Sequence, residues 1–327
     1  MELIYIYYIN FKPIFNQSMD KYALTVENLT KVYSDSKNKK ENKALNDLNF
    51  QVKQGEVFGL LGPNGAGKTT FLSILGGTVS KTNGNINVWG FDLDKNPRQV
   101  KASIGIVPQE VNLDAFFSPR KLLELQAGLY GITKKDRITD LILEMVALKD
   151  KANAYSRSLS GGMKRRLLIA KAMVHQPPIL ILDEPTAGVD VELRNNLWNN
   201  VKELNKEGVT IILTTHYLFE AQEMCDRIAI IDKGNLVALD TTQRLLDRIQ
   251  TKKINFKVKN IDKNKILKME GIQFKIDSND SISVTYEKNS LNFGEIINYL
   301  SKNNVKILDI VTEDGDLEDV FVQLTNK

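Results

Sequence analysis

The chain has 327 residues, a hydrophobic content of 42% and a formal net charge of +4, values ordinary for a globular protein with one large core or two domains. The mild, interspersed charge suits work beside an anionic membrane surface and does not indicate nucleic-acid binding. A single cysteine, Cys225, excludes an intramolecular disulfide framework and favours a reducing compartment.

The N-terminal segment carries an apolar run, Leu3 to Ile9, that is far shorter than the roughly 20 residues a membrane-spanning helix needs. A second methionine, Met19, precedes the first well-patterned strand. We therefore expect residues 1–18 to be a tail or a mis-assigned start, and a membrane-surface anchor is the weaker interpretation.

A glycine-rich segment follows the short apolar strand expected at Val57 to Leu61. It fits the spacing G-x-x-x-x-G-K-[ST] of a phosphate-binding loop, in which backbone N–H groups close around phosphate oxygens. Lys68 would reach the β and γ phosphates, and the Thr69 hydroxyl would bind Mg²⁺. A helix expected from Thr70 to Leu75 adds an N-terminus that favours anions. The predicted nucleotide-binding residues are Gly62, Pro63, Asn64, Gly65, Ala66, Gly67, Lys68, Thr69 and Thr70.

Other predicted strands also end in polar residues. The run Ile104 to Val107 leads to Gln109, and the run Thr210 to Thr215 leads to His216. In open parallel sheets ligands bind outside the carboxyl ends of the strands. We therefore expect these side chains to meet the phosphate loop at one edge of a mostly parallel sheet.

The buried strand expected at Ile179 to Leu182 delivers two adjacent carboxylates to the same edge. Asp183 would hold the Mg²⁺ that bridges the β and γ oxygens, and Glu184 would orient or deprotonate the attacking water. Alone, such a pair is more often a strand-end turn. Together with the phosphate loop, it favours nucleotide hydrolysis.

Ser160, Gly161 and Gly162 open a further predicted helix that is rich in basic residues. An ordinary serine N-cap would explain this start. A second anion site, in which the hydroxyl and two backbone N–H groups donate to a γ-phosphate, would explain it too. At Leu159 to Arg166 the chain resembles the LSGGQ signature of the nucleotide-binding domain of ABC transporters, with Met163 where glutamine is usual.

This resemblance covers Tyr22 to Leu239 and implies ATP as substrate and Mg²⁺ as its metal. A tyrosine placed like Tyr33 stacks on adenine in that family, a glutamine placed like Gln109 senses the metal and water, and a histidine placed like His216 contacts the γ-phosphate. Asp190 matches the D-loop aspartate. The implied Mg²⁺ ligands are Thr69, Gln109 and Asp183, and the implied catalytic residues are Glu184, His216 and Gln109.

The family also implies a dimer. The signature of one subunit faces the phosphate loop of the other, so two ATP molecules lie between two subunits arranged head to tail. Hydrolysis removes the γ-phosphate that both faces share, which lets the halves separate. The sequence leaves open whether the dimer contains two identical ATPases.

The expected fold is α/β: a P-loop NTPase core with a mostly parallel sheet, an antiparallel β subdomain and an inserted helical subdomain, plus a small α+β C-terminal domain. The expected boundaries are 19–245 for the nucleotide-binding domain, about 110–175 for its helical subdomain, and 250–327 for the accessory domain.

Segments beginning at Ser160, Ala187 and Leu213 look like those of ATPase subunits of bacterial ABC-2-type exporters, including multidrug ones. This finer resemblance implies an integral-membrane permease that binds the helical subdomain, and a place at the cytoplasmic face of the membrane. The alternative is a soluble ABC ATPase that acts on nucleic acid or ribosomes. Such proteins carry a long coiled coil, zinc modules or tandem cassettes, and the sequence has none of these signals.

Overall fold

A computed structural model describes residues 21–35, 40–187, 191–249, 251–259, 261, 269, 272–278, 280–287, 293–313 and 315–325. The predictions for residues 1–18 and for Asp190 lie outside these ranges. The chain divides into two compact units, Met1–Asp240 and Thr241–Lys327. Within the described part, no helix is both long and apolar enough to cross a membrane.

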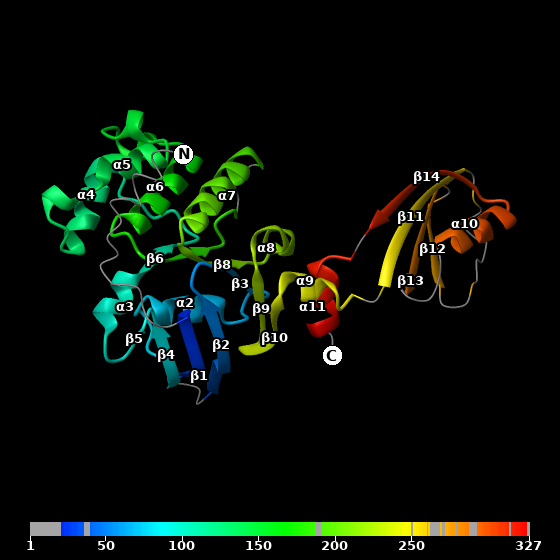
Figure 1. Ribbon diagram of the computed structural model, residues 1–327, viewed down its shortest axis with the longest axis horizontal. Helices are drawn as coiled ribbons and strands as arrows, with labels where there is room; N and C mark the ends of the chain where they lie inside the picture. Colours follow the sequence, from blue (N-terminus) through cyan, green and yellow to red (C-terminus); the bar gives the residue numbers. More distant parts are fainter. Residues whose placement is uncertain are drawn as a thin grey trace. The chain divides into compact units, whose positions relative to one another are not determined.

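An antiparallel sheet lies at the start of the first unit (Figure 1). Its strand order is β2 (Lys40–Lys53), β1 (Tyr22–Asp35), β4 (Asn83–Val88), β5 (Phe91–Asp92). Alternate residues of β1, including Leu24 and Val26, are buried, as expected for a sheet with one face on a core. The expected antiparallel subdomain is therefore present.

A second sheet of the first unit brings the predicted strand ends together. Its order among the described residues is β10 (Asn235–Thr241), β9 (Arg227–Asp232), β3 (Val57–Leu61), β8 (Thr210–Thr215), β7 (Ile179–Asp183), β6 (Ile104–Val107). The pairs β9–β3, β3–β8, β8–β7 and β7–β6 are all parallel. Parallel neighbours have their carboxyl ends at one edge. The segments that follow β3, β6, β7 and β8 therefore leave the sheet on the same side.

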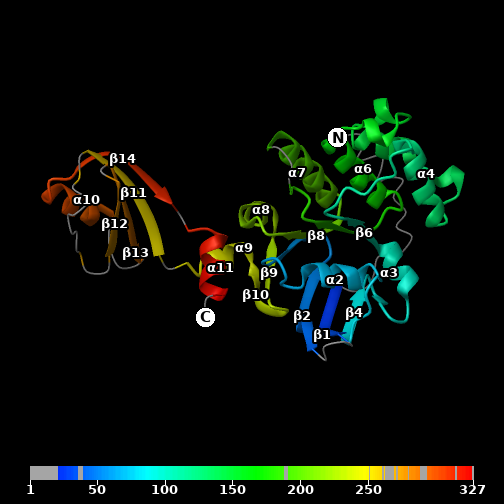
Figure 2. The ribbon, with the colours of Figure 1, turned by 180° about the vertical axis from the view of Figure 1, so that it is seen from behind.

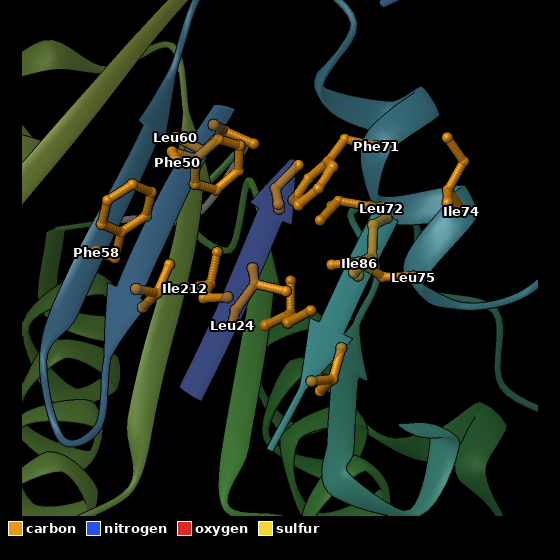
Figure 3. Packing of buried hydrophobic residues seen from close by; sticks show 14 of the residues in the cluster. Leu24, Phe50, Phe58, Leu60, Phe71, Leu72, Ile74, Leu75, Ile86 and Ile212 are labelled. Carbon is orange, nitrogen blue, oxygen red and sulfur yellow. The ribbon is translucent and has the colours of Figure 1, made fainter. Parts of the chain in front are cut away.

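The main core lies where the two sheets meet around helix α2 (Lys68–Leu75). Figure 3 shows Phe71 and Leu72 of α2 beside Leu24 and Ile86 of the antiparallel sheet, with Phe58 of β3 close by. The Phe50 ring stacks on that of Phe58, with centroids 5.7 Å apart. Aromatic pairs of this kind contribute about 0.5–1.5 kcal/mol beyond the area they bury. This packing fixes the direction in which α2 leaves the phosphate loop.

Helices surround the sheets of the first unit. Those of the expected helical insertion gather together in both views (Figures 1 and 2), apart from strands β1, β2 and β4. The helices after α2 are α3 (Pro97–Ser103), α4 (Pro119–Leu129), α5 (Thr139–Met145), α6 (Gly161–Met173), α7 (Val191–Lys206) and α8 (Leu218–Met224). Short 3₁₀ turns lie at Lys134–Asp136, Lys149–Lys151 and Ser156–Ser158.

The second unit is an antiparallel sheet with a helix against its apolar face. Its elements are α9 (Thr242–Leu246), β11 (Thr251–Lys259), β12 (Ile272–Ser278), β13 (Ser281–Glu287), α10 (Phe293–Lys302), β14 (Lys306–Glu313) and α11 (Leu317–Thr325), with strand order β12-β13-β11-β14. Ile254 and Phe256 of β11 pack with Ile296 and Leu300 of α10. A small α+β domain was expected over residues 250–327, and α9 precedes that boundary.

Candidate active site

The phosphate loop is enclosed by neighbouring backbone. Strand β3 is buried throughout, and the chain turns into α2 through Gly65 and Gly67, whose φ angles are +83° and +110°. A Cβ on Gly67 would lie 2.6 Å from the Ala44 carbonyl oxygen, and one on Gly62 would lie 2.2 Å from that of Ile231. Glycine is therefore required at both positions by the surrounding chain, besides any contact with phosphate.

Lys68 is buried at the start of α2, and its ammonium lies over the loop. Its Nζ donates hydrogen bonds to the carbonyl oxygens of Gly62 at 2.6 Å and Pro63 at 3.2 Å. Burial lowers the pKa of Lys68, and the negative charges of Glu184 and Asp183 oppose this shift. Within the described part of the chain no carboxylate pairs directly with this cation, which suits an anionic ligand.

A cavity of about 460 Å³ opens above the loop, within the range usual for small-molecule sites. Tyr33 lies on its wall with an exposed ring, where a flat base could stack. The residues around it are Tyr33, Asn42, Lys43, Ala44, Pro63, Asn64, Gly65, Ala66, Gly67, Lys68, Thr69, Thr70, Gln109, Glu184 and Lys233. Neither Asp183 nor His216 is among them.

The neighbouring strand β8 holds the Asp183 carboxylate and the Glu184 backbone at the end of β7. The Thr214 hydroxyl donates to Oδ1 of Asp183 at 2.5 Å, and the Glu184 N–H donates to the Thr214 carbonyl oxygen at 3.0 Å. Glu184 has a φ of +43°, a left-handed conformation that costs a non-glycine residue about 1 kcal/mol or more. Its carboxylate is buried but lines the cavity.

Gln109 and His216 converge on one oxygen of Glu184. Nε2 of Gln109 donates to Oε2 of Glu184 at 2.9 Å, and Nδ1 of His216 lies 3.1 Å from the same oxygen. The predicted convergence of strand ends is therefore correct for these three side chains. Two polar groups that hold a carboxylate beside a cavity are suited to orienting a water molecule for attack.

The Ser160 segment lies elsewhere in the subunit. The Ser160 hydroxyl accepts from the N–H of Met163 at 3.2 Å and caps α6, so the ordinary N-cap is what the single chain displays. Ser160, Gly161 and Gly162 do not line the cavity, and a Cβ on Gly161 would meet nothing within 4 Å. Backbone N–H groups at this helix start are available to an anion that comes from outside the subunit.

The donor set fits a magnesium ion that shares its coordination with phosphate. The Thr69 hydroxyl, the Asp183 carboxylate and the Gln109 amide oxygen belong to the segments that meet at this edge. Among the described residues no group of three or more His, Cys, Asp or Glu side chains is assembled to hold a metal by itself. Mg²⁺ commonly takes one or two protein oxygens and completes its shell with phosphates and water.

Some residues of the site were not anticipated from the sequence. Thr214 orients Asp183 and the Glu184 backbone, while Asn42, Lys43 and Lys233 line the cavity. Thr214 sits two residues before His216 on a predicted strand, so strand alternation could have placed it beside β7. The cavity residues on β2 and in the turn between β9 and β10 could not be found in this way, because their position depends on how the two sheets pack together.

This geometry is that of a nucleoside triphosphatase with a phosphate-binding loop. A family model described as ABC transporter matches residues 45–187. The chain is 41% identical over 229 residues to the linearmycin resistance ATP-binding protein LnrL of Bacillus subtilis, covering 69% of this chain and 71% of that one. It therefore belongs to the ABC transporter ATP-binding family, whose members bind and hydrolyse ATP.

Further relatives agree with this assignment. The Nod factor export ATP-binding protein I of Cupriavidus pinatubonensis is 40% identical over 205 residues, which are 62% of this chain and 63% of that protein, less than two thirds of its length. A solved ATP-binding subunit of an ABC transporter matches with a TM-score of 0.61 and 28% identity, over 69% of this chain and 92% of that chain. An ATP-binding cassette solved as a dimer in a post-hydrolysis state with ADP and Pi matches at 0.59 and 26% identity, over 67% and 98%.

Proposed function

We propose that this chain is the ATPase subunit of an ABC exporter of the ABC-2 type, which drives a separate membrane permease from the cytoplasmic face. The observation that carries the proposal is the arrangement of the site: Gln109 and His216 meet Glu184 beside the phosphate loop, whereas Ser160 lies outside that cavity. The names of the relatives, which concern linearmycin resistance and Nod factor export, support the direction of transport.

In this proposal the side chains divide the work of binding ATP, placing the water and holding the metal, and Gln109 takes part in two of these tasks. Lys68 and the loop N–H groups hold the β and γ phosphates, and Tyr33 stacks on the adenine. Glu184 orients or deprotonates the attacking water, while His216 and Gln109 keep its carboxylate in place. Thr69, Asp183 and Gln109 would hold Mg²⁺, which neutralises charge that develops on the transferred phosphoryl group.

The position of Ser160 supports a site completed by a second subunit. Its hydroxyl and the Gly161 and Gly162 N–H groups would donate to the γ-phosphate of an ATP bound by the partner subunit. The D-loop aspartate, proposed as Asp190, would lie at the same interface. A head-to-tail dimer then closes on two Mg-ATP and opens after hydrolysis, because ADP lacks the group that both subunits contact.

The helical subdomain offers a surface for the permease. Phe116 is 70% exposed and Leu129 is 83% exposed, and Phe117 and Leu125 are exposed as well. Neither phenylalanine therefore belongs to the core. Leu129 also lines a cavity between α3 and α4, together with Arg98, Lys101, Gln126 and Tyr130 among others. A cytoplasmic helix of the permease with apolar and acidic residues would complement this surface.

Capture from membranes tests the proposal. A tagged full-length chain, expressed in its native cells, should co-purify from detergent-solubilised membranes with a polytopic membrane protein. Phe116→Asp should lose that partner. Leu308→Asp is the matched control and should keep it, because it also places one charge at an exposed apolar position but lies outside the helical subdomain. A chain that stays partnerless in the soluble fraction would contradict the proposal. DNA binding that weakens steeply with salt would favour the alternative function.

A further inference from the structure

Arg165 connects two segments of the active site that are far apart in the sequence. It is the fifth residue of α6 and only 5% exposed. Its Nε donates to the Pro185 carbonyl oxygen at 2.8 Å, and its Nη2 donates to that of Glu184 at 2.7 Å. Its Nη1 donates to the carbonyl oxygens of Pro108 at 2.8 Å and Gln109 at 2.7 Å. The guanidinium thus serves four backbone acceptors.

The position of these acceptors explains why a fork of donors is needed. Strands β6 and β7 are paired as far as Val107 and Leu182; β6 ends there, and β7 ends one residue later at Asp183. Buried carbonyl oxygens beyond the last pair need another donor. The planar guanidinium carries five N–H groups in a fixed arrangement, so one side chain can bridge the segments that follow both strands.

Burying the charge of Arg165 to satisfy these carbonyl oxygens costs folding free energy. Within the described residues, no ion pair includes Arg165; the negative charge of Asp183 favours its charged form, whereas burial lowers its pKa. A buried charge without a contacting counter-ion costs several kcal/mol in principle. Burying a neutral donor would cost less free energy. Stability alone therefore does not explain the buried cation, and its presence indicates a functional reason.

Arg165 binds the backbone of Gln109 and Glu184, the two residues whose side chains are hydrogen-bonded to each other. Its Nη1 and Nη2 fix the carbonyls of Gln109 and Glu184, while the side chains of these two residues share a 2.9 Å hydrogen bond. Glu184 also has a left-handed φ of +43°, which persists only where the surroundings enforce it. Thr214 holds its N–H side and Arg165 holds its carbonyl side.

We propose that Arg165 is a positioning residue for ATP hydrolysis, which fixes the backbones of Gln109 and Glu184 relative to each other and links them to the Ser160 helix start. The inference rests on the role proposed for Glu184 in orienting water. Arg165 lies five residues after Ser160, about 7.5 Å along the helix axis. A γ-phosphate that binds the start of α6 therefore acts on the same helix that carries Arg165 and, through it, on the Glu184 carbonyl.

The test is Arg165→Lys in the purified full-length chain. Lysine keeps the charge but offers a single ammonium in place of a planar fork, so it cannot serve all four carbonyls. We expect kcat to fall about tenfold to a hundredfold, with the half-saturating ATP concentration within about twofold of wild type. The matched control is Arg166→Lys, because Arg166 donates to the carbonyls of Val146 and Ala147 inside the helical subdomain and should keep its kcat.

A double-variant measurement separates positioning from general destabilisation. If Arg165 acts through the Gln109–Glu184 contact, Gln109→Ala should reduce kcat several-fold less in the Arg165→Lys background than in wild type. Wild-type kcat in Arg165→Lys, or independent effects of the two changes, would overturn the proposal. So would an Arg165→Lys chain that fails to fold when Arg166→Lys folds, since Arg165 would then serve the fold as a whole.

The role of Glu184 is checked in the same assay. If Glu184→Gln hydrolyses ATP at the wild-type rate, the function assigned to Glu184 is wrong, whatever Arg165→Lys does. The assay needs no permease, so failure to find a membrane partner leaves the result for Arg165 intact.

Discussion

Nδ1 of His216 lies 3.1 Å from Oε2 of Glu184, which is also the oxygen that receives the Gln109 amide. The carboxylate is therefore oriented by side chains that follow two different strands, β8 and β6. This arrangement makes Glu184 the centre of the site and its orientation a property of the whole sheet edge.

Glu184→Gln should retain ATP binding and lose turnover by about a hundredfold to ten-thousandfold, the range usual for removal of a general base. The amide has the shape of the carboxylate, so the cavity is preserved. Phosphate release measures turnover, and size-exclusion chromatography with ATP should show a trapped dimer. Undiminished hydrolysis would remove Glu184 from the catalytic role.

Lys68→Ala should weaken ATP binding by about tenfold to a hundredfold, because a hydrogen bond to a charged group contributes about 1.5–3 kcal/mol. Equilibrium titration with a fluorescent ATP analogue would measure this. Lys233→Ala removes another cavity lysine, one that is exposed, and should have a smaller effect. Equal losses in the two variants would mean that the ammonium of Lys68 has no special position.

Glycines of the two anion-binding segments should respond differently to alanine. Gly62→Ala places a Cβ 2.2 Å from the Ile231 carbonyl oxygen and should destabilise the fold by about 1–3 kcal/mol. Gly161→Ala meets nothing within 4 Å in its own chain, so its stability should be unchanged or slightly higher. Its ATPase rate should still fall about tenfold or more, because the methyl group would obstruct a phosphate held by the partner subunit.

Urea unfolding and steady-state ATPase assays on the same preparations would separate these two effects. Full activity of Gly161→Ala would contradict a site completed by a second subunit. A Gly62→Ala chain as stable as wild type would show that the loop can move away from Ile231.

The sequence was sufficient for features that depend on local pattern. An apolar run predicts the strand that ends at Asp183 and the one that leads to His216. The glycine spacing predicts the phosphate loop. Arg165 has no such pattern, because every residue carries a backbone carbonyl and the sequence does not show which ones lack a partner. The sequence shows it only as one of several basic residues at a helix start, and its burial follows from how α6 packs against β6.

His175 should make stability depend on pH. Its ring is 2% exposed and stacks on Tyr130 with centroids 3.7 Å apart. Nε2 lies 3.1 Å from the Ile104 carbonyl oxygen, which requires the proton of the neutral ring to be on Nε2. The buried Nδ1 has no hydrogen-bond partner among the residues that the structure describes. Protonation of Nδ1 would place a cation in apolar surroundings. Burial accordingly lowers the pKa of His175 from 6.5 to about 4.

The direction in which stability changes with pH follows from the difference between the pKa of His175 in the unfolded and the folded chain. The unfolded chain takes up the proton near pH 6.5 and the folded chain only near pH 4, so the contribution to stability is complete above pH 6.5 and is lost as the pH falls toward 4. Its size is about 3 kcal/mol, from roughly 1.4 kcal/mol for each pH unit of difference.

His175→Gln cannot titrate in this range and should be less stable at pH 7.5 but lose less stability between pH 6.5 and 4. Urea midpoints across this range measure the slope. His216→Gln, which removes the chain's other histidine, is the control. If it flattened the curve as much as His175→Gln does, the dependence would not come from the buried ring.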